Sequence, residues 1–132
     1  MKKGNRQSFS SGAEWEDIAG YSRAVRVGNI IEVAGTTAMK DGVLVGKNDI
    51  YLQTKTILSI IKDAIEGLGG TIDQTVRTRM FVTDITQWES VAKAHGEVFG
   101  KIKPASTMVE VSGLIDPDMM IEIEASAIVD DV

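Results

Sequence analysis

The sequence predicts an α+β domain in which a mixed β-sheet carries two helices on one face. Segments of alternating apolar and polar residues are spaced as strands, and two stretches between them carry apolar residues at helical spacing. The 132 residues contain no linker, repeat or low-complexity tract between Ile18 and Val129. We therefore expect a single domain over residues 18–132, preceded by a flexible N-terminal arm over residues 1–17 that is rich in small polar residues.

The first two strands are predicted over residues 23–27 and 30–34, on either side of Gly28-Asn29. This dipeptide favours a two-residue hairpin turn because one or both positions take positive φ. The turn sets the register, with the facing pairs Val27–Ile30, Arg26–Ile31, Val25–Glu32 and Ala24–Val33. Ala24, Ile31 and Val33 then share an apolar face, and Arg23 and Glu32 lie on a polar one.

The first helix is predicted over residues 49–68, where apolar residues form a stripe with a period of 3.6. Asn48 or Asp49 can cap its start, and the glycines around its end are a stop signal. Thr86-Gln87-Trp88-Glu89 matches a capping box and predicts a second helix to about Phe99. Its expected buried stripe consists of Trp88, Val91, Ala92, His95, Val98 and Phe99.

The remaining strands are predicted over residues 76–82, 107–111 and 120–129. In the first of them, alternation places Val76, Thr78, Met80 and Val82 on one face. Two helices cover only one face of the sheet. The other face collects polar side chains, namely Tyr21, Arg23, Glu32, Arg77, Arg79, Glu122, Glu124 and Ser126. Such a face is either a solvated surface with cross-strand ion pairs or an oligomer interface lined by site-forming groups.

Composition excludes several classes of function. Cysteine is absent, which excludes disulfides, thiolate metal ligation and a thiol nucleophile. The 14 Lys and Arg residues against 19 Asp and Glu give a net charge of −5, which argues against nucleic-acid binding. One histidine without cysteine does not predict a metal site, and no residue pattern predicts a cofactor. No secretory or membrane-spanning segment is evident, so we expect a cytoplasmic protein that binds small molecules or other chains.

Several motifs follow one another in a characteristic order. They are Ile18-Ala19-Gly20-Tyr21-Ser22-Arg23-Ala24-Val25, Val27-Gly28-Asn29, Thr78-Arg79-Met80-Phe81-Val82-Thr83-Asp84, Val98-Phe99, Pro104-Ala105 before Val109-Glu110-Val111, and Ile121-Glu122-Ile123-Glu124-Ala125. Their order and spacing resemble the Rid family, also called YjgF or L-PSP endoribonuclease-like. The resemblance implies a chorismate-mutase-like fold and a barrel-forming homotrimer with three small-molecule sites between subunits. Well-studied members hydrolyse reactive imines and enamines to 2-oxo acids and ammonia.

The resemblance also implies site residues. Tyr21 and Glu122 match the family's site tyrosine and the glutamate that orients or activates a water molecule. Ala34 stands where many members have a site serine. Ser106 occupies the position of the arginine that binds the substrate carboxylate, so this chain represents a branch that lacks that arginine. Loss of one charge-assisted hydrogen bond of this kind costs about 1.5–3 kcal/mol, which weakens 2-imino acid binding roughly ten- to hundred-fold.

Two other groups of side chains are candidates for the site. Arg23, Arg77 and Arg79 share the predicted polar face with Glu122 and can offer a relocated guanidinium. His95 is the sole histidine. Core packing explains it most simply, but with Glu97 or Glu110 it can also serve proton transfer.

Two functions are consistent with these residues. The first is a hydrolase of small imines or enamines in which Glu122 orients the water and Tyr21 holds the substrate. The second is a non-catalytic trimer that binds a small ligand or a partner through the same clefts. Endoribonuclease activity fits poorly, because RNA cleavage needs an acid and base pair and cations along the backbone.

Overall fold

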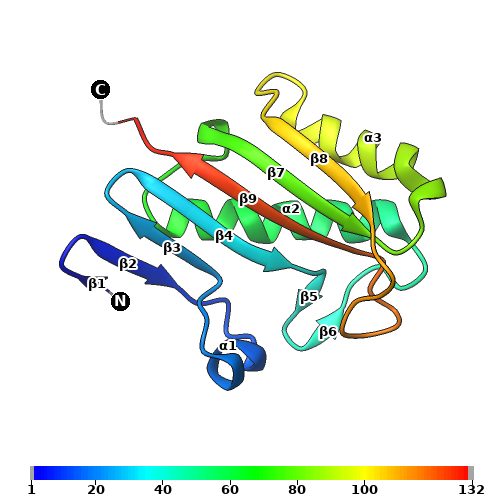
Figure 1. Cartoon of the computed structure of the whole chain (residues 1–132), viewed down its shortest axis with the longest axis horizontal. Helices are drawn as coiled ribbons and strands as arrows, with labels where there is room; N and C mark the ends of the chain where they lie inside the picture. Colours follow the sequence, from blue (N-terminus) through cyan, green and yellow to red (C-terminus); the bar gives the residue numbers. More distant parts are fainter. Residues whose placement is uncertain (1, 131–132) are drawn as a thin grey trace.

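The computed structural model describes residues 2–130 and contains one main sheet with helices packed on it (Figure 1). This sheet has seven strands in the order β1-β2-β3-β4-β9-β7-β8. Their bounds are β1 Lys2–Lys3, β2 Arg6–Phe9, β3 Ala24–Val27, β4 Ile30–Thr36, β7 Thr75–Val82, β8 Ala105–Glu110 and β9 Ile121–Ile128. A separate hairpin consists of β5 Met39–Lys40 and β6 Val43–Leu44. The helices are α1 Glu14–Ala19, α2 Ile50–Gly67 and α3 Trp88–Phe99, with short 3-10 turns η1 Ile72–Gln74 and η2 Ile85–Gln87.

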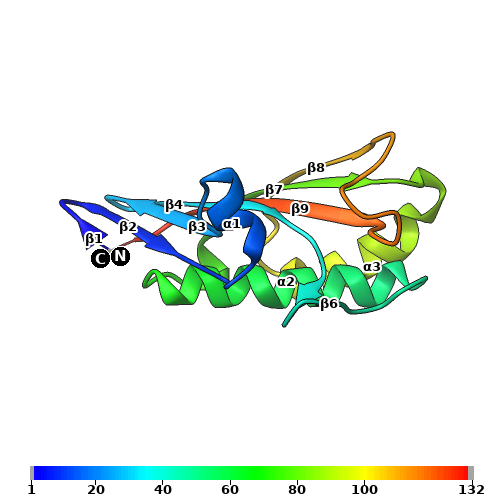
Figure 2. The ribbon, with the colours of Figure 1, turned by 90° about the horizontal axis from the view of Figure 1, so that it is seen from below.

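The sheet is mixed, as predicted. β7 and β8 run parallel, and the other neighbouring pairs are antiparallel. Helices α2 and α3 lie side by side under one face (Figure 2). The core fills the space between this face and the two helices, and Ile57, Ile61 and Ile123 are among its fully buried residues. The α+β class and the placement of both long helices on one face are therefore confirmed.

The β3–β4 hairpin has the predicted register, including Val25 opposite Glu32 and Ala24 opposite Val33. Gly28 in the turn has a φ of 59°, a conformation that residues with a side chain rarely adopt. Helix α2 also agrees with the prediction. Asp49 caps its start by accepting a hydrogen bond from the backbone N–H of Leu52 at 3.0 Å.

Two details of the predicted faces are wrong. Val76 does not share the buried face of Thr78, because a bulge between Thr75 and Arg77 shifts the register of β7 against β9. Val76 is 43% exposed. Trp88, expected in the buried stripe of the second helix, is 52% exposed.

The predicted capping box at Thr86 is also absent from the start of the second helix. The chain first forms η2, and Asp84 caps it by accepting hydrogen bonds from the backbone N–H and the hydroxyl of Thr86. Helix α3 therefore begins one residue later than the box implied, at Trp88. Its buried residues also differ from the predicted stripe, since Ala92 is exposed while Ala94 is buried.

The N-terminal segment contains regular structure that the sequence did not predict. β2 pairs with β3 in an antiparallel register that places Ser8 opposite Val25. Phe9 packs against the core, where it lies so close to Gly67 at the end of α2 that a Cβ there would overlap the aromatic ring. We expected the arm over residues 1–17 to be loosely held because its residues are small and polar. The pairing uses backbone groups, which that composition does not reveal.

Candidate functional site

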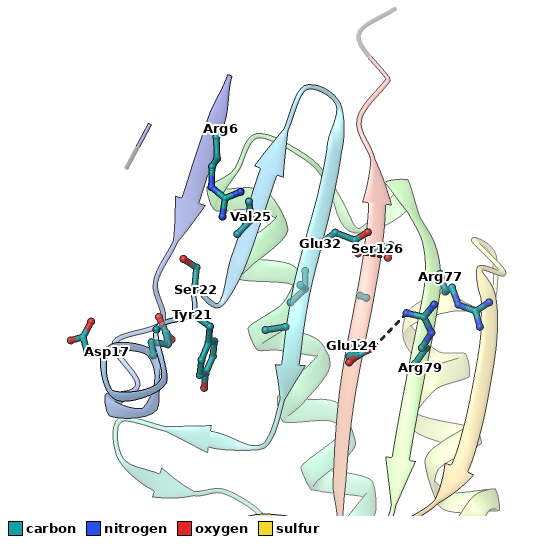
Figure 3. A pocket seen from close by; sticks show the side chains of 15 residues that line it. Arg6, Asp17, Tyr21, Ser22, Val25, Glu32, Arg77, Arg79, Glu124 and Ser126 are labelled. Atoms are coloured by element: carbon teal, nitrogen blue, oxygen red, sulfur yellow. Dashed lines mark hydrogen bonds and ion pairs between the residues drawn. The ribbon is translucent and has the colours of Figure 1, made fainter. Parts of the chain in front are cut away.

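A broad cavity (Figure 3) lies over one face of the sheet, on the side opposite to α2 and α3 in the ribbon of Figure 2. Its volume is about 680 Å³, and it extends from the segment around α1 across β3, β4 and β9 to β7. Its lining is mostly polar: Arg6, Glu16, Asp17, Tyr21, Ser22, Glu32, Arg77, Arg79, Glu124 and Ser126. Six of the eight residues predicted for the polar face line this cavity, and the other two, Arg23 and Glu122, line the smaller cavity described below.

Ion pairs and hydrogen bonds link neighbouring strands across this cavity. Arg79 on β7 approaches Glu124 on β9, with 3.5 Å between guanidinium nitrogen and carboxylate oxygen (Figure 3). Ser126 on β9 donates a hydrogen bond to Glu32 on β4. The side chains of Arg79 and Glu124 are 49% and 39% exposed, so water screens their attraction.

A second, smaller cavity of about 80 Å³ adjoins the start of β9. Tyr21 lines both cavities, and Arg23 and Glu122 line the smaller one. The rest of the smaller cavity combines apolar side chains with backbone and hydroxyl groups, from Ser11, Ala13, Trp15, Gly35, Thr36, Thr37, Met39, Ile60, Ile115 and Met119. It therefore offers an ionisable pair surrounded by apolar walls.

Arg23 differs from the other residues of the polar face in its burial, because only 6% of its surface is exposed. Its guanidinium donates hydrogen bonds to the carbonyl of Gly35 at 2.6 Å, the hydroxyl of Thr36 at 3.1 Å and the hydroxyl of Tyr21 at 3.2 Å. It also lies 3.7 Å from the carboxylate of Glu16 on α1. Arg23 thus connects the N-terminal segment to the end of β4.

Glu16 is itself buried, with 4% of its surface exposed. Burial alone raises the pKa of its carboxyl group. Hydrogen bonds from Ser11 and Ser10 and the positive charge of Arg23 outweigh burial, so the pKa of Glu16 lies below its usual value. Glu16 is therefore an ionised partner for Arg23 at neutral pH.

Glu122 is half-buried at the start of β9 and faces Gly35 on β4. A Cβ on residue 35 would overlap the Glu122 carboxylate, so this approach requires glycine. Burial raises the pKa of Glu122, the charge of Arg23 lowers it in part, and Glu124 raises it further. The net upward shift makes the Glu122 carboxylate a stronger base than an exposed glutamate.

Ser106 and His95 lie elsewhere in the chain, on the outer strand β8 and on α3. The hydroxyl of Thr78 on β7 joins them, with 2.8 Å to Ser106 Oγ and 2.9 Å to His95 Nε2. His95 also packs against Phe99, with 4.7 Å between ring centroids. Burial lowers the pKa of His95, so its ring is neutral at neutral pH.

The residues predicted for the site fall into three places. Tyr21, Arg23 and Glu122 come together at the smaller cavity. Ala34 and Arg79 line only the larger one. Ser106 on β8 and His95 on α3 are both hydrogen-bonded to the hydroxyl of Thr78. Neither of the two glutamates considered as partners of His95 bonds to it, since Glu97 contacts Tyr51 and Lys55 and Glu110 accepts from the backbone of Ile85.

Sequence reasoning missed several residues that shape these places. Glu16 was assigned to the arm, Gly35 was not singled out, and Thr78 was treated as a core position. A glycine inside a strand signals a close approach, and this signal was available for Gly35. The parallel register that sets Thr78 opposite Ser106 gives no such signal.

Two further observations limit what the described residues can do. Among them, no three His, Cys, Asp or Glu side chains cluster in a way that could hold a metal ion. Within the same part of the chain, each helix is too short or too polar to cross a membrane.

Comparison with known proteins identifies the family. A family model described as Endoribonuclease L-PSP matches residues 12–129. A RutC family protein from Pyrococcus abyssi is 38% identical over 112 residues, which cover 83% of this chain and 87% of that protein.

Two crystal structures of similar proteins share the fold. Rv2704 from Mycobacterium tuberculosis, described as a member of the YjgF/YER057c/UK114 family, is 47% identical with a TM-score of 0.86, covering 94% of this chain and 99% of that one. YyfA from Yersinia pestis, described as a Rid family protein, is 31% identical with a TM-score of 0.84 and the same coverage. As the motifs from Ile18 to Ala125 predicted, the chain belongs to the Rid family, also known as YjgF.

Proposed function

We propose that this chain forms a homotrimer that hydrolyses small imines or enamines in clefts between its subunits. Glu122 activates the water and Tyr21 holds the substrate. The observation that carries the proposal is the setting of Glu122, a half-buried carboxylate with a raised pKa beside Arg23 and Tyr21 at a partly apolar cavity. Membership of the Rid family supports a role of this type.

The arrangement of side chains supports a site completed by a second subunit. Glu122 and Tyr21 lie near α1 and the start of β9, whereas Ser106 lies on β8, at the outer end of the strand order (Figure 1). The larger cavity lies on a sheet face that neither long helix covers. Burying such a face against further copies is a common reason for closed oligomers. A cleft between copies can bring the two groups of residues together.

The chemistry needs one base that can also return its proton. Glu122 accepts a proton from water while the water oxygen bonds to the imine carbon. The electron pair of the C=N bond moves to nitrogen, which takes the proton from Glu122. Glu122 then accepts the proton of the new hydroxyl and passes it to the nitrogen, the C–N bond breaks, ammonia leaves and the hydroxyl oxygen becomes the carbonyl of the product. The sum is imine plus water giving an oxo compound plus ammonia, and Glu122 ends as it began.

Ser106 sets the expected substrate preference. A neutral hydroxyl at this position replaces the guanidinium that would make two charge-assisted bonds to a carboxylate. Two of the three arginines predicted as substitutes have acidic partners in this chain: Arg23 bonds to Glu16 and the end of β4, and Arg79 pairs with Glu124. The third, Arg77, donates to the hydroxyl of Thr107, while its buried Nε has no hydrogen-bond partner. With a neutral Ser106 and two of these arginines engaged, we expect weak turnover of 2-imino acids and better turnover of imines without a carboxylate.

The test measures oligomeric mass by light scattering and ammonia release from enzymatically generated 2-iminopropanoate on the same sample. Ser106→Arg is expected to raise kcat/KM for this substrate by about ten- to hundred-fold, in line with one charge-assisted bond. Glu122→Gln in the Ser106→Arg background is the matched control and should abolish the gain. A monomer, or a gain that survives Glu122→Gln, would contradict the proposal.

A non-catalytic binding role is the alternative, and the serine at position 106 favours it. In that case a trimer would bind 2-oxo acids or neutral carbonyl compounds in calorimetry without releasing ammonia from any imine, including one without a carboxylate. Turnover of a neutral imine by the unmodified chain would exclude this alternative.

A further inference from the structure

Three polar side chains of one subunit form a line from the surface into the protein. Ser106 on β8 is exposed, Thr78 on β7 is fully buried, and His95 on α3 is half-buried. The parallel register of β7 and β8 places Thr78 directly opposite Ser106. Thr78 Oγ1 lies 2.8 Å from Ser106 Oγ and 2.9 Å from His95 Nε2, which are ordinary hydrogen-bond lengths.

The central hydroxyl has only one proton, so the hydrogen bonds have two consistent directions. In the first, Ser106 donates to Thr78 and Thr78 donates to His95 Nε2. In the second, His95 Nε2–H donates to Thr78, and Thr78 donates to Ser106. The structure has Thr78 donating to Ser106, and rotation of the two hydroxyls gives the first direction. From the first direction, a shift of the Ser106 proton to Thr78 and of the Thr78 proton to His95 Nε2 leaves Thr78 unchanged.

We propose that Ser106, Thr78 and His95 form a proton relay that makes Ser106 a nucleophile toward electrophiles that reach β8. When Ser106 Oγ forms a bond to an electrophile, its own proton passes to Thr78 Oγ1. The proton of Thr78 passes at the same time to His95 Nε2, which becomes an imidazolium. The electrophile's leaving group departs with the electron pair of its bond, and the imidazolium later releases its proton to solvent.

His95 is a neutral proton acceptor, and its burial makes it a weaker base than an exposed histidine. Burial is the cause of its lowered pKa, so the ring is neutral at neutral pH. Several charged side chains on the neighbouring elements have other partners. On α2 and α3, Lys55 pairs with Glu97 at 3.3 Å and Lys93 lies over the ring of Tyr51, which itself bonds to Glu97. On β7 and β8, Arg77 bonds to Thr107, Arg79 pairs with Glu124, and Glu110 accepts from the backbone of Ile85.

The relay differs from the proposed imine hydrolysis in its residues and its chemistry. It uses three side chains of one subunit and does not involve Glu122. Its test needs neither an imine nor ammonia release. Failure of one proposal therefore leaves the other standing.

Phenylmethanesulfonyl fluoride is a suitable probe, because its S–F bond breaks when a serine oxygen bonds to sulfur and fluoride leaves. The full chain is treated between pH 5 and 9, and the label is located by mass spectrometry of peptides. The midpoint of His95 titration is measured on the same protein from its imidazole C–H signals. We expect the label at Ser106, with a rate that rises through the His95 midpoint.

Three variants separate a relay from a merely structural hydrogen bond. Thr78→Val removes the bridging hydroxyl and should lower the labelling rate above the His95 midpoint by about tenfold or more and flatten the pH profile, since base catalysis of this kind contributes at least that factor. His95→Phe keeps a ring against Phe99 and should give the same flat profile. Thr78→Ser keeps the hydroxyl and should keep the inflection.

Several results would overturn the relay. They are no label at Ser106, equal labelling of other exposed serines such as Ser112, a rate that does not follow the His95 midpoint, or a Thr78→Val rate within twofold of the unmodified chain. Folding of each variant is checked by circular dichroism. Thr78→Ser and His95→Phe keep the test decisive if Thr78→Val does not fold.

Discussion

Replacing Arg23 with methionine should destabilise the protein strongly. Methionine keeps an apolar stem of similar length but removes the guanidinium, which is buried and donates to Gly35, Thr36 and Tyr21. The variant also leaves the buried carboxylate of Glu16 without its positive partner at 3.7 Å. Removing one member of a buried ion pair typically costs about 3–5 kcal/mol. Hydrogen bonds from Ser11 remain on Glu16, so we expect about 3 kcal/mol, the lower end of that range.

The measurement is urea unfolding followed by circular dichroism at one protein concentration, since any oligomer makes stability depend on concentration. Arg79→Met is the matched control, because Arg79 forms an ion pair of similar length whose side chains are 49% and 39% exposed. Exposed pairs contribute about 0–1 kcal/mol. If Arg23→Met and Arg79→Met lower the free energy of unfolding by the same amount, the buried interactions of Arg23 do not stabilise the fold more than an exposed ion pair does, and the prediction is wrong.

Two further predictions concern Glu122 and its neighbour. Because the pKa of Glu122 is raised on folding, the folded chain binds more protons than the unfolded chain between the two pKa values, and the free energy of unfolding falls as pH rises through that interval. The Glu122→Gln variant should therefore melt at the same or a higher temperature than the unmodified protein at pH 7, and this difference should disappear near pH 4. The same variant should lose imine hydrolysis. A lower melting temperature of the variant at pH 7 would refute the upward direction of the Glu122 pKa shift. Gly35→Ala should destabilise by about 1–3 kcal/mol, because its Cβ overlaps the Glu122 carboxylate. Gly96→Ala, in open space on α3, is the control and should change stability by no more than about 1 kcal/mol, in the stabilising direction. Equal melting curves for the two alanine variants would show that Glu122 moves aside without cost.

Local signals in the sequence predicted those parts of the fold that depend on neighbouring residues. Gly28-Asn29 determined the register of the first hairpin, and the apolar stripe with Asp49 at its start predicted α2. Where the backbone departs from regular geometry, alternation failed. The bulge beside Val76 shifts the register of β7, and a 3-10 turn replaces the predicted capping box before Trp88.

The candidate site residues were predicted from strand alternation and from family motifs. Tyr21 and Glu122 came from the motifs, and both line the smaller cavity. The burial of Arg23 depends on Glu16, which comes from a helix that composition did not reveal. The contact of Thr78 with both Ser106 and His95 depends on a parallel strand pair and on α3. Such long-range packing has no signature in a single sequence.

The close approach of Gly35 to Glu122 links two positions that are far apart in the chain. Any residue with a Cβ at position 35 occupies the space that the Glu122 carboxylate fills, so the two positions are not free to change independently. During divergence, a lineage that replaces Gly35 must move, shorten or lose the Glu122 side chain, and each of these changes displaces the base of the proposed reaction. Among homologues, a side chain at position 35 should therefore accompany a residue smaller than glutamate at position 122. Covariation at these two positions would mark where the family has given up water activation at this place.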